Sequence, residues 1–325
     1  MINQFRTINP INILLLLIVA VLIRVGVLFN LPESLNVLLV EPYTGVLLQL
    51  PADFFSPFSS VFYAVIISVI QALILNRMVN NYNLLPKPTF LPALMYVTLT
   101  ALITPFVVLS PVLIANFFLL WLIEKFLSIY RKDHVIAVVF DMGMIVGAGT
   151  LVYFPFIAML LLLWIVLLIF RPFNWREWVS GITGFLTVCL FLAVLNYLND
   201  SWGVLSATAF PFATTFPNDF AVNLYDYTVL VPVIALSFLS FLTISQKLNR
   251  SNVHVRKSYL TLLIMFLFAA LSFYIKSEYN IYHFILTLPP LAIFLAHYFI
   301  SAQKRWFYES LYLILVGCII YFQIF

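Results

Sequence analysis

Residues 135–170 read VIAVVFDMGMIVGAGTLVYFPFIAMLLLLWIVLLIF, and this stretch decides the fold class. It holds one charged residue, Asp141, and Pro155 divides it at an aromatic-proline turn. Each half approaches the length of about 20 apolar residues that a helix needs to cross a hydrocarbon core roughly 30 Å thick. Proline suits the first turn of a helix because it lacks the N–H that would be unpaired there. The stretch therefore predicts two membrane helices joined by a tight turn.

The rest of the chain has the same character. Of its 325 residues, 64% are hydrophobic and only 9% are charged, and the mean hydropathy is +1.10. Soluble proteins carry about 45–50% apolar and about 25% charged residues. A chain with so few charges cannot cover a water-facing surface, which excludes a cytosolic enzyme or a nucleic-acid-binding protein. The composition predicts an all-α polytopic membrane protein.

A scan with the length of a membrane-crossing helix predicts about eleven transmembrane helices. The predicted spans are 11–29, 57–76, 89–107, 110–128, 135–153, 155–170, 179–198, 228–246, 259–275, 281–300 and 307–325. The first apolar run is too long for a signal-peptide core and no small-residue cleavage site follows it, so we interpret it as a retained helix. No repeat or linker separates the spans, and we treat residues 1–325 as one membrane domain.

The basic residues predict the orientation. With the N-terminus in the cytoplasm, fourteen of the sixteen Lys and Arg residues fall on the cytoplasmic side. Lys276 then lies outside, and Arg24 lies within a span. Short cytoplasmic loops carry an excess of Lys and Arg. The pattern predicts that the N-terminus is cytoplasmic and that the C-terminus is outside.

Two predicted outer loops are long, and we name residues 30–56 the first outer loop and residues 199–227 the second. Long loops in compact proteins are more often functional than spare. The first reads NLPESLNVLLVEPYTGVLLQLPADFFS, and its apolar pieces 33–41 and 43–50 are long enough for short interfacial helices. Its three acids are Glu33, Glu41 and Asp53. Each acid is either a solvated loop charge or a catalytic base beside the bilayer.

Two motifs carry a resemblance to a known superfamily. They are Glu41-Pro-Tyr43-Thr-Gly45 in the first outer loop and FDMGMIVGAGTLVYFPFIAMLLLLW at 140–164. Together with the predicted topology, they resemble the GT-C glycosyltransferases, which are integral-membrane enzymes with polyprenyl-phosphate-linked sugar donors. The resemblance implies a GT-C-like fold, with Glu41 as the catalytic base and Tyr43 beside it. The chain departs from the superfamily because Glu41 lacks the adjacent second acid of many members.

The resemblance also extends to the second outer loop. A loop after the seventh helix borders the active site in the superfamily, which makes Trp202, Asp219 and Asp226 further candidates. Aromatic side chains there could stack on sugar rings or bury against the helix ends. Separately, RPFNWREW at 171–178 resembles an uncharacterised integral-membrane family of Bacteroidota, and that resemblance implies no activity. The family resemblances together imply a bacterial inner membrane.

Two cations are candidates for binding a lipid phosphate, the group that leaves during transfer. Arg24 is a basic residue inside a span, and such residues are functional-site hypotheses by default. It could instead extend to the interface or pair with Glu33 or Glu41. Lys276 could contact the phosphate or pair with Glu278. His283, one turn beyond, is expected to be a hydrogen-bonded interface residue rather than a base.

Other features have structural explanations. Asp141 is expected to pair with Lys132, His134 or a neighbouring helix, because lone acids in lipid are costly. A Gly-x-x-x-Gly pattern on the same span predicts close helix packing. No Walker motif, dinucleotide fingerprint or Cys/His cluster occurs, so no residue pattern points to metal ligands or to a bound cofactor, and the need for a divalent metal stays open from the sequence.

Three hypotheses remain open from the sequence. The first is a transferase that uses a polyprenyl-phosphate sugar at the outer face, with membrane lipids around it. The second is a non-catalytic membrane subunit that supports a protein partner. The third is a carrier or flippase for a lipid-linked substrate, which would need charged groups near the bilayer midplane and inverted repeats.

Overall fold

The computed structural model describes residues 1–29, 31, 44, 56–132, 134–208, 212–213, 228–248, 251–276 and 280–324. Throughout this part the regular secondary structure is helical, with no strand. Six of the predicted site residues lie outside the described residues, namely Glu33, Glu41, Tyr43, Asp53, Asp219 and Asp226. The other four, which are Arg24, Trp202, Lys276 and His283, are described.

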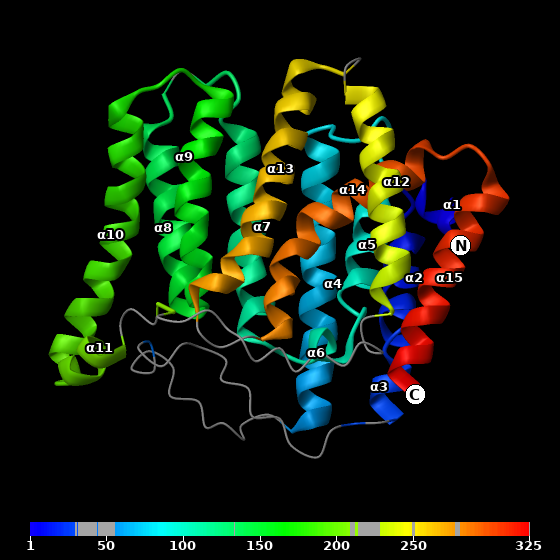
Figure 1. Cartoon of the computed structure of the whole chain (residues 1–325), viewed down its shortest axis with the longest axis horizontal. Helices are drawn as coiled ribbons and strands as arrows, with labels where there is room; N and C mark the ends of the chain where they lie inside the picture. The colour runs from blue at the N-terminus through cyan, green and yellow to red at the C-terminus, as the bar shows by residue number, and fades with distance from the viewer. Residues whose placement is uncertain are drawn as a thin grey trace.

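Successive long helices run in opposite directions, as Figure 1 shows. The α-helices are α1 Ile2–Phe5, α2 Ile11–Leu22, α3 Val25–Phe29, α4 Pro57–Asn81, α5 Leu91–Leu99, α6 Thr104–Val107, α7 Pro111–Ser128, α8 Ile136–Val152, α9 Ala158–Phe170, α10 Trp175–Leu198, α11 Trp202–Thr208, α12 Leu230–Leu248, α13 Val253–Leu271, α14 Leu288–Ser301 and α15 Arg305–Ile324. Three 3₁₀ helices extend them, η2 Phe154–Ile157, η3 Ser272–Ile275 and η4 Ile281–Thr287. The chain thus forms an up-and-down helical bundle.

The two ends of the bundle differ in charge. We call the end where α4, α7, α9, α12 and α14 finish the basic end, which lies at the top of Figure 1. Its turns hold Lys87, Arg131, Lys132, Arg171 and Lys304. We call the opposite end, where α3, α8, α10 and α13 finish, the loop end, because both long outer loops join helices there.

Six helical segments in the described part are long and apolar enough to cross a membrane. They are Pro57–Asn81, Pro111–Ser128, Trp175–Leu198, Val253–Ile275, Ile281–Ser301 and Arg305–Ile324. Four shorter apolar segments, such as Ile136–Val152, fall on other predicted spans. The all-helical fold is therefore confirmed for the described residues, with six candidate membrane-spanning helices, while the eleven crossings and their orientation stay predictions.

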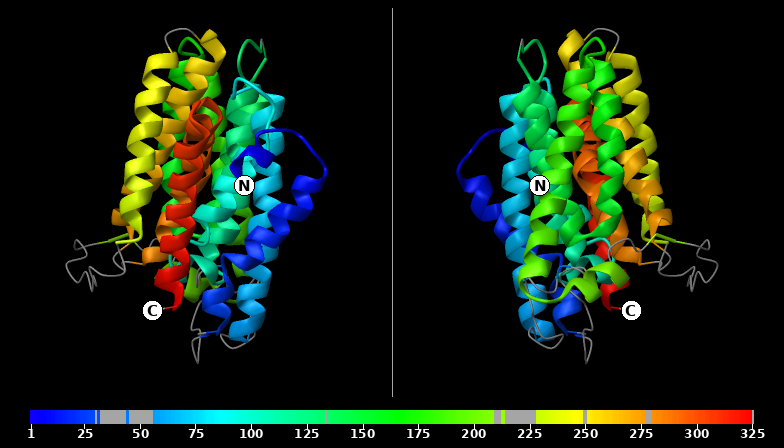
Figure 2. Two further views of the ribbon diagram at one scale, coloured as in Figure 1. Left: turned by 90° about the vertical axis from the view of Figure 1, so that its right-hand side faces the viewer. Right: turned by 90° about the vertical axis from the view of Figure 1, so that its left-hand side faces the viewer.

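Two of the predicted spans are divided. The span 11–29 becomes α2 and α3, because the chain turns at Ile23 and Arg24 before α3 begins. The span 89–107 becomes α5 and the short α6, whose first turn contains Pro105. Proline suits the first turn of a helix, where its missing N–H would be unpaired. Figure 2 shows α2 inclined against the long helices.

The centre of the bundle is formed by α5 and α14. Every residue of α5 is buried, and so is nearly all of α14. The two helices pack on each other, with α4 against α5 and α12 against α14. A helix that is hydrophobic all round belongs in a protein core. The short α5 is thus enclosed by protein on every side.

The closest packing in the bundle joins α8 and α10. A Cβ atom added to Gly143 would collide with the carbonyl oxygen of Gly181, and one added to Gly184 would collide with that of Phe140. At Gly147 the added atom would lie 2.9 Å from Cβ of Val188. Small residues let helix backbones approach closely in membranes. The Gly-x-x-x-Gly pattern therefore has the packing function that the sequence predicts.

Candidate functional site

The turn between α8 and η2 is the meeting point of several segments at the loop end. Tyr153 has an extended backbone that ends α8, and Pro155 lies in the first turn of η2. Phe154 packs with Leu192 and Leu205 in a small cluster separate from the main core. The turn therefore packs against the last part of α10 and against α11.

The first outer loop reaches this turn at Thr44. The Thr44 side chain is 1% exposed, and its Oγ1 donates a hydrogen bond to the carbonyl oxygen of Leu151, 3.1 Å away. These two residues are 107 positions apart in the chain. They belong to the two motifs that resemble the GT-C superfamily. The structure thus brings the two motifs into contact at one hydrogen bond.

The second outer loop reaches the same region. The ring of Phe212 meets the ring of Phe154 edge to face, with centroids 5.0 Å apart. The backbone N–H of Ala213 donates to the carbonyl oxygen of Ile275, at 2.8 Å. Trp202 begins α11 and is 54% exposed. Described residues of both loops therefore lie at the α8–η2 turn and at η3.

His283 lies inside the bundle next to this turn and is 1% exposed. Its Nε2 lies 2.8 Å from the carbonyl oxygen of Ala269, so Nε2 carries the proton and donates it. Nδ1 then accepts from the Tyr153 hydroxyl, 2.7 Å away. A ring that donates at one nitrogen and accepts at the other is the neutral imidazole. His283 therefore fastens η4 to α8 and α13, in agreement with the predicted hydrogen-bonded role but deeper than an interface residue.

Arg24 is enclosed between α2, α4 and α5, with its side chain 1% exposed. Nη1 donates to the carbonyl oxygen of Ala20 at 3.0 Å. Nη2 donates to Oγ of Ser68 at 3.1 Å and to Oγ1 of Thr100 at 2.9 Å. Arg24 takes part in none of the ion pairs between described residues. The guanidinium thus rests on neutral oxygens and does not extend to the interface; pairing with Glu33 or Glu41 lies outside the described residues.

A second polar group lies between α4, α5 and α7, and the sequence analysis missed it. The Tyr96 hydroxyl donates to Oε1 of Gln71 at 2.7 Å and accepts from Nδ2 of Asn116 at 3.1 Å. Asn116 also donates to the carbonyl oxygen of Ile285 at 3.0 Å. The available signal was the amides in otherwise apolar spans, since buried polar groups need hydrogen-bond partners. This group ties η4, which leads into α14, to the centre of the bundle.

Two further charged residues that the sequence analysis considered, Lys276 and Asp141, are also described. Lys276 caps the end of η3 at the loop end, and its predicted partner Glu278 lies outside the described residues. Asp141 pairs with Nζ of Lys125 on α7, at 2.7 Å. The predicted pairing of Asp141 with a neighbouring helix is confirmed. No group of three or more His, Cys, Asp or Glu side chains that could hold a metal occurs within the described residues.

Comparisons with known proteins place the chain in a family. The sequence model of a family of unknown function, DUF6427, matches residues 31–325. The chain belongs to that family. No curated protein and no solved structure matches it. Because the function of DUF6427 is unknown, membership in this family does not indicate an activity.

Proposed function

We propose that this member of DUF6427 is an inner-membrane glycosyltransferase that uses a polyprenyl-phosphate-linked sugar at the outer face. The observation that carries the proposal is the hydrogen bond between Thr44 and Leu151, because it joins the two motifs that resemble the GT-C superfamily. Described residues of the second outer loop, Phe212 and Ala213, contact the same region. A transferase of this kind needs its acidic loop beside the helix ends where a lipid-linked donor arrives.

In the proposed reaction, Glu41 is the base. It takes the proton of the acceptor hydroxyl while the oxygen of that hydroxyl attacks the anomeric carbon. The bond between the anomeric carbon and the phosphate oxygen breaks, and polyprenyl phosphate leaves with the bonding electrons. Glu41 precedes Thr44 by three residues, and three residues of chain reach at most about 11 Å. Glu33 and Asp53 are the alternative acids of the same loop.

The leaving phosphate needs positive charge or oriented donors. We assign this function first to Lys276, because it lies at the end of η3, the element whose Ile275 accepts the hydrogen bond from Ala213. Arg24, the other cation predicted for this function, is enclosed between α2, α4 and α5, and we do not assign the function to it. Tyr43, Trp202, Asp219, Asp226 and His283 are proposed to shape the substrate site. His283 would act by holding Tyr153 and the α8–η2 turn in place.

The proposal includes eleven membrane crossings with a cytoplasmic N-terminus and an outer C-terminus. Each of the eleven predicted spans falls on a helix or a pair of consecutive helices, and these run alternately up and down. The basic residues collect at one end of the bundle. The positive-inside rule assigns that end to the cytoplasm and the loop end to the outside.

The second candidate function is a non-catalytic membrane subunit. The enclosure of Arg24 by Ala20, Ser68 and Thr100 favours it, since a guanidinium held by three oxygens inside the bundle supports structure without any ligand. In that function the outer loops would hold a protein partner. The two functions differ in turnover, which can be measured.

The test is an assay of donor turnover with the full-length protein in lipid nanodiscs. Synthetic undecaprenyl-phosphate-linked hexoses and pentoses serve as donors, and source membranes lacking this protein supply the acceptor. Mass spectrometry measures the undecaprenyl phosphate that is released. The wild type is expected to release it from at least one donor, and Glu41→Gln to lose at least about 100-fold in rate, the contribution typical of a general base.

Asp200→Asn is the matched control, because Asp200 is an exposed acid of the second outer loop just after α10. This variant should keep the wild-type rate. Full activity in Glu41→Gln would overturn the assignment of the base. Absence of release from every donor by the wild type would overturn the transferase and leave the non-catalytic subunit.

A further inference from the structure

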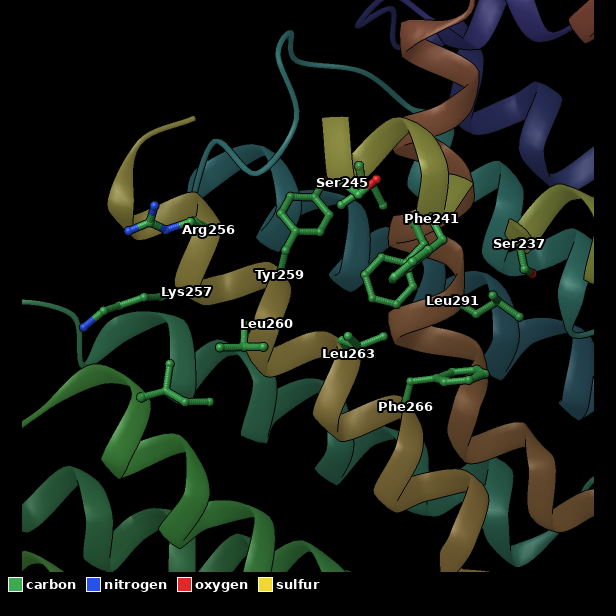
Figure 3. A pocket seen from close by; sticks show the side chains of 13 residues that line it. Ser237, Phe241, Ser245, Arg256, Lys257, Tyr259, Leu260, Leu263, Phe266 and Leu291 are labelled. Atoms are coloured by element: carbon green, nitrogen blue, oxygen red, sulfur yellow. The ribbon is translucent and has the colours of Figure 1, made fainter. Parts of the chain in front are cut away.

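The helices α12 and α13 follow each other in the chain but differ in their main neighbours. α12 lies mainly on α14, whereas α13 lies mainly on α9 and η4 and also contacts α14. Between them, over the surface of α13, is a cavity of about 640 Å³, which Figure 3 shows from close by. This volume is in the range of about 300–1,000 Å³ that small-molecule sites occupy. Consecutive helices that leave such a space open have room for a ligand.

The lining of this cavity suits a hydrocarbon chain. Its walls are mostly apolar and include Phe241 from α12 with Leu260, Leu263 and Phe266 from α13. Ser237 also lines it, but its hydroxyl donates to the carbonyl oxygen of Val233 in its own helix, at 2.7 Å. Phe241 and Leu260 are exposed at the surface of the bundle, which would face lipid if these helices cross the membrane. A chain could therefore enter sideways from the bilayer.

One end of the cavity is positively charged. Arg256 and Lys257, in the first turns of α13, line the cavity at the basic end, and Figure 3 shows their side chains extending away from the apolar walls. Neither forms an ion pair with any residue that the structure describes. The N-terminus of a helix also favours negative charge. An apolar slot with cations at its headgroup end matches an anionic lipid.

We infer that the cavity between α12 and α13 binds an anionic glycerophospholipid, with one acyl chain along Phe241 and Leu263 and the phosphate at Arg256 and Lys257. Clusters of basic residues beside a membrane attract anionic lipids. The inference is independent of the proposed transferase, because this cavity lies at the basic end and the donor site is assigned to the loop end. The bound lipid would fill the space that the two helices leave open.

The experiment is native mass spectrometry of the full-length protein released from nanodiscs with equal amounts of phosphatidylglycerol and phosphatidylethanolamine. The wild type is expected to retain phosphatidylglycerol in preference. Each basic side chain near a membrane surface contributes about fivefold in binding of an anionic lipid. The Arg256→Gln/Lys257→Gln double variant should therefore reduce the preference by about 25-fold. Absence of any preference in the wild type overturns the inference.

Lys304→Gln/Arg305→Gln is the matched control, because it removes two basic side chains from another turn of the same end that does not line the cavity. It should keep the preference, and an equal loss in both double variants would mean general charge attraction and overturn the site. Leu263→Trp fills the cavity while both cations remain. It should lower the amount of retained lipid of either class, and unchanged retention would show that no chain occupies the cavity.

Discussion

Two pairs of helices in this bundle differ in how closely they pack. We call α8 and α10 the closed pair, and α12 and α13 the open pair. In α8 and α10, glycines bring one backbone against the other, and Gly143 and Gly184 leave no room for even one added carbon atom. In α12 and α13, large side chains such as Phe241 and Phe266 stand at the margins of an open cavity. All four helices are apolar, so hydropathy does not decide which pairs close. The size of the residues at the contact decides it.

The largest expected effect comes from Gly143→Ala, which breaks the closed pair. The added Cβ would collide with the backbone of α10, and α8 would have to move as a whole. Overpacking typically costs about 1–3 kcal/mol, and we expect the upper end of that range here because backbone cannot rotate away. Thermal unfolding in nanodiscs measures the loss.

Gly317→Ala is the matched control for that variant. Gly317 also lies inside a helix, α15, but a Cβ atom added to it would have no other atom within 4 Å. Alanine at an interior helix position is favoured over glycine by about 0.5–1 kcal/mol. This variant should therefore be neutral or stabilising, and a loss of stability equal to that of Gly143→Ala would refute the packing explanation.

The second largest loss of stability is expected around Arg24, where hydrogen bonds rather than glycine contacts hold α2, α4 and α5 together. Ser68→Ala removes one of the three oxygens that hold the buried guanidinium. Hydrogen bonds to charged groups contribute about 1.5–3 kcal/mol, so we expect a loss of about 2 kcal/mol in the free energy of unfolding. Ser240→Ala is the control, because that buried hydroxyl bonds only within its own helix α12. Equal losses would show that Arg24 gains nothing from Ser68.

A smaller effect is expected at Ser180, which links the closed pair through its side chain. Its hydroxyl donates to the carbonyl oxygen of Ile136 on α8, at 2.7 Å. Hydrogen bonds between membrane helices average about 0.6 kcal/mol, and Ser180→Ala should cost about that much. In the open pair, Ser237→Ala should cost less, since Ser237 bonds within α12. A larger loss at Ser237 than at Ser180 would reverse the comparison.

The smallest effect should come from the open pair itself. Leu260 lines the cavity and is 45% exposed. Leu260→Ala is expected to change the free energy of unfolding by no more than about 0.5 kcal/mol, as surface substitutions usually do. Denaturation of that variant beside the wild type measures it. A loss above about 2 kcal/mol would indicate that α12 and α13 are packed as a core.

The sequence predicted the parts of the fold that depend on local composition. The all-α membrane class follows from the scarcity of charge, and the close contact at Gly143 follows from the spacing of small residues. The turn at Arg24 was not predictable, because its partners Ser68 and Thr100 are distant in the chain. No local sequence pattern indicates that Arg24 contacts Ser68 and Thr100.

The candidate site was predictable only as a set of segments. The motif around Thr44 and the one around Leu151 were each visible in the sequence, but their contact depends on how α8 and the first outer loop meet. The hydrogen bond between Tyr153 and His283 was not predicted, because Tyr153 was interpreted only as part of the aromatic-proline turn. Asp141 was expected to have a partner. That the partner is Lys125 depends on the packing of α7 against α8.

The proposed transferase depends on which end of the bundle faces the cytoplasm, and sided labelling measures this most directly. Cys189 and Cys318 are replaced by serine, and single cysteines are placed at Asp200 near the loop end and at Gln303 in the turn before α15 at the basic end. In intact spheroplasts, a membrane-impermeant maleimide should label Asp200→Cys and should label Gln303→Cys only after lysis. Labelling of Gln303→Cys in intact spheroplasts, with Asp200→Cys protected, would contradict the account.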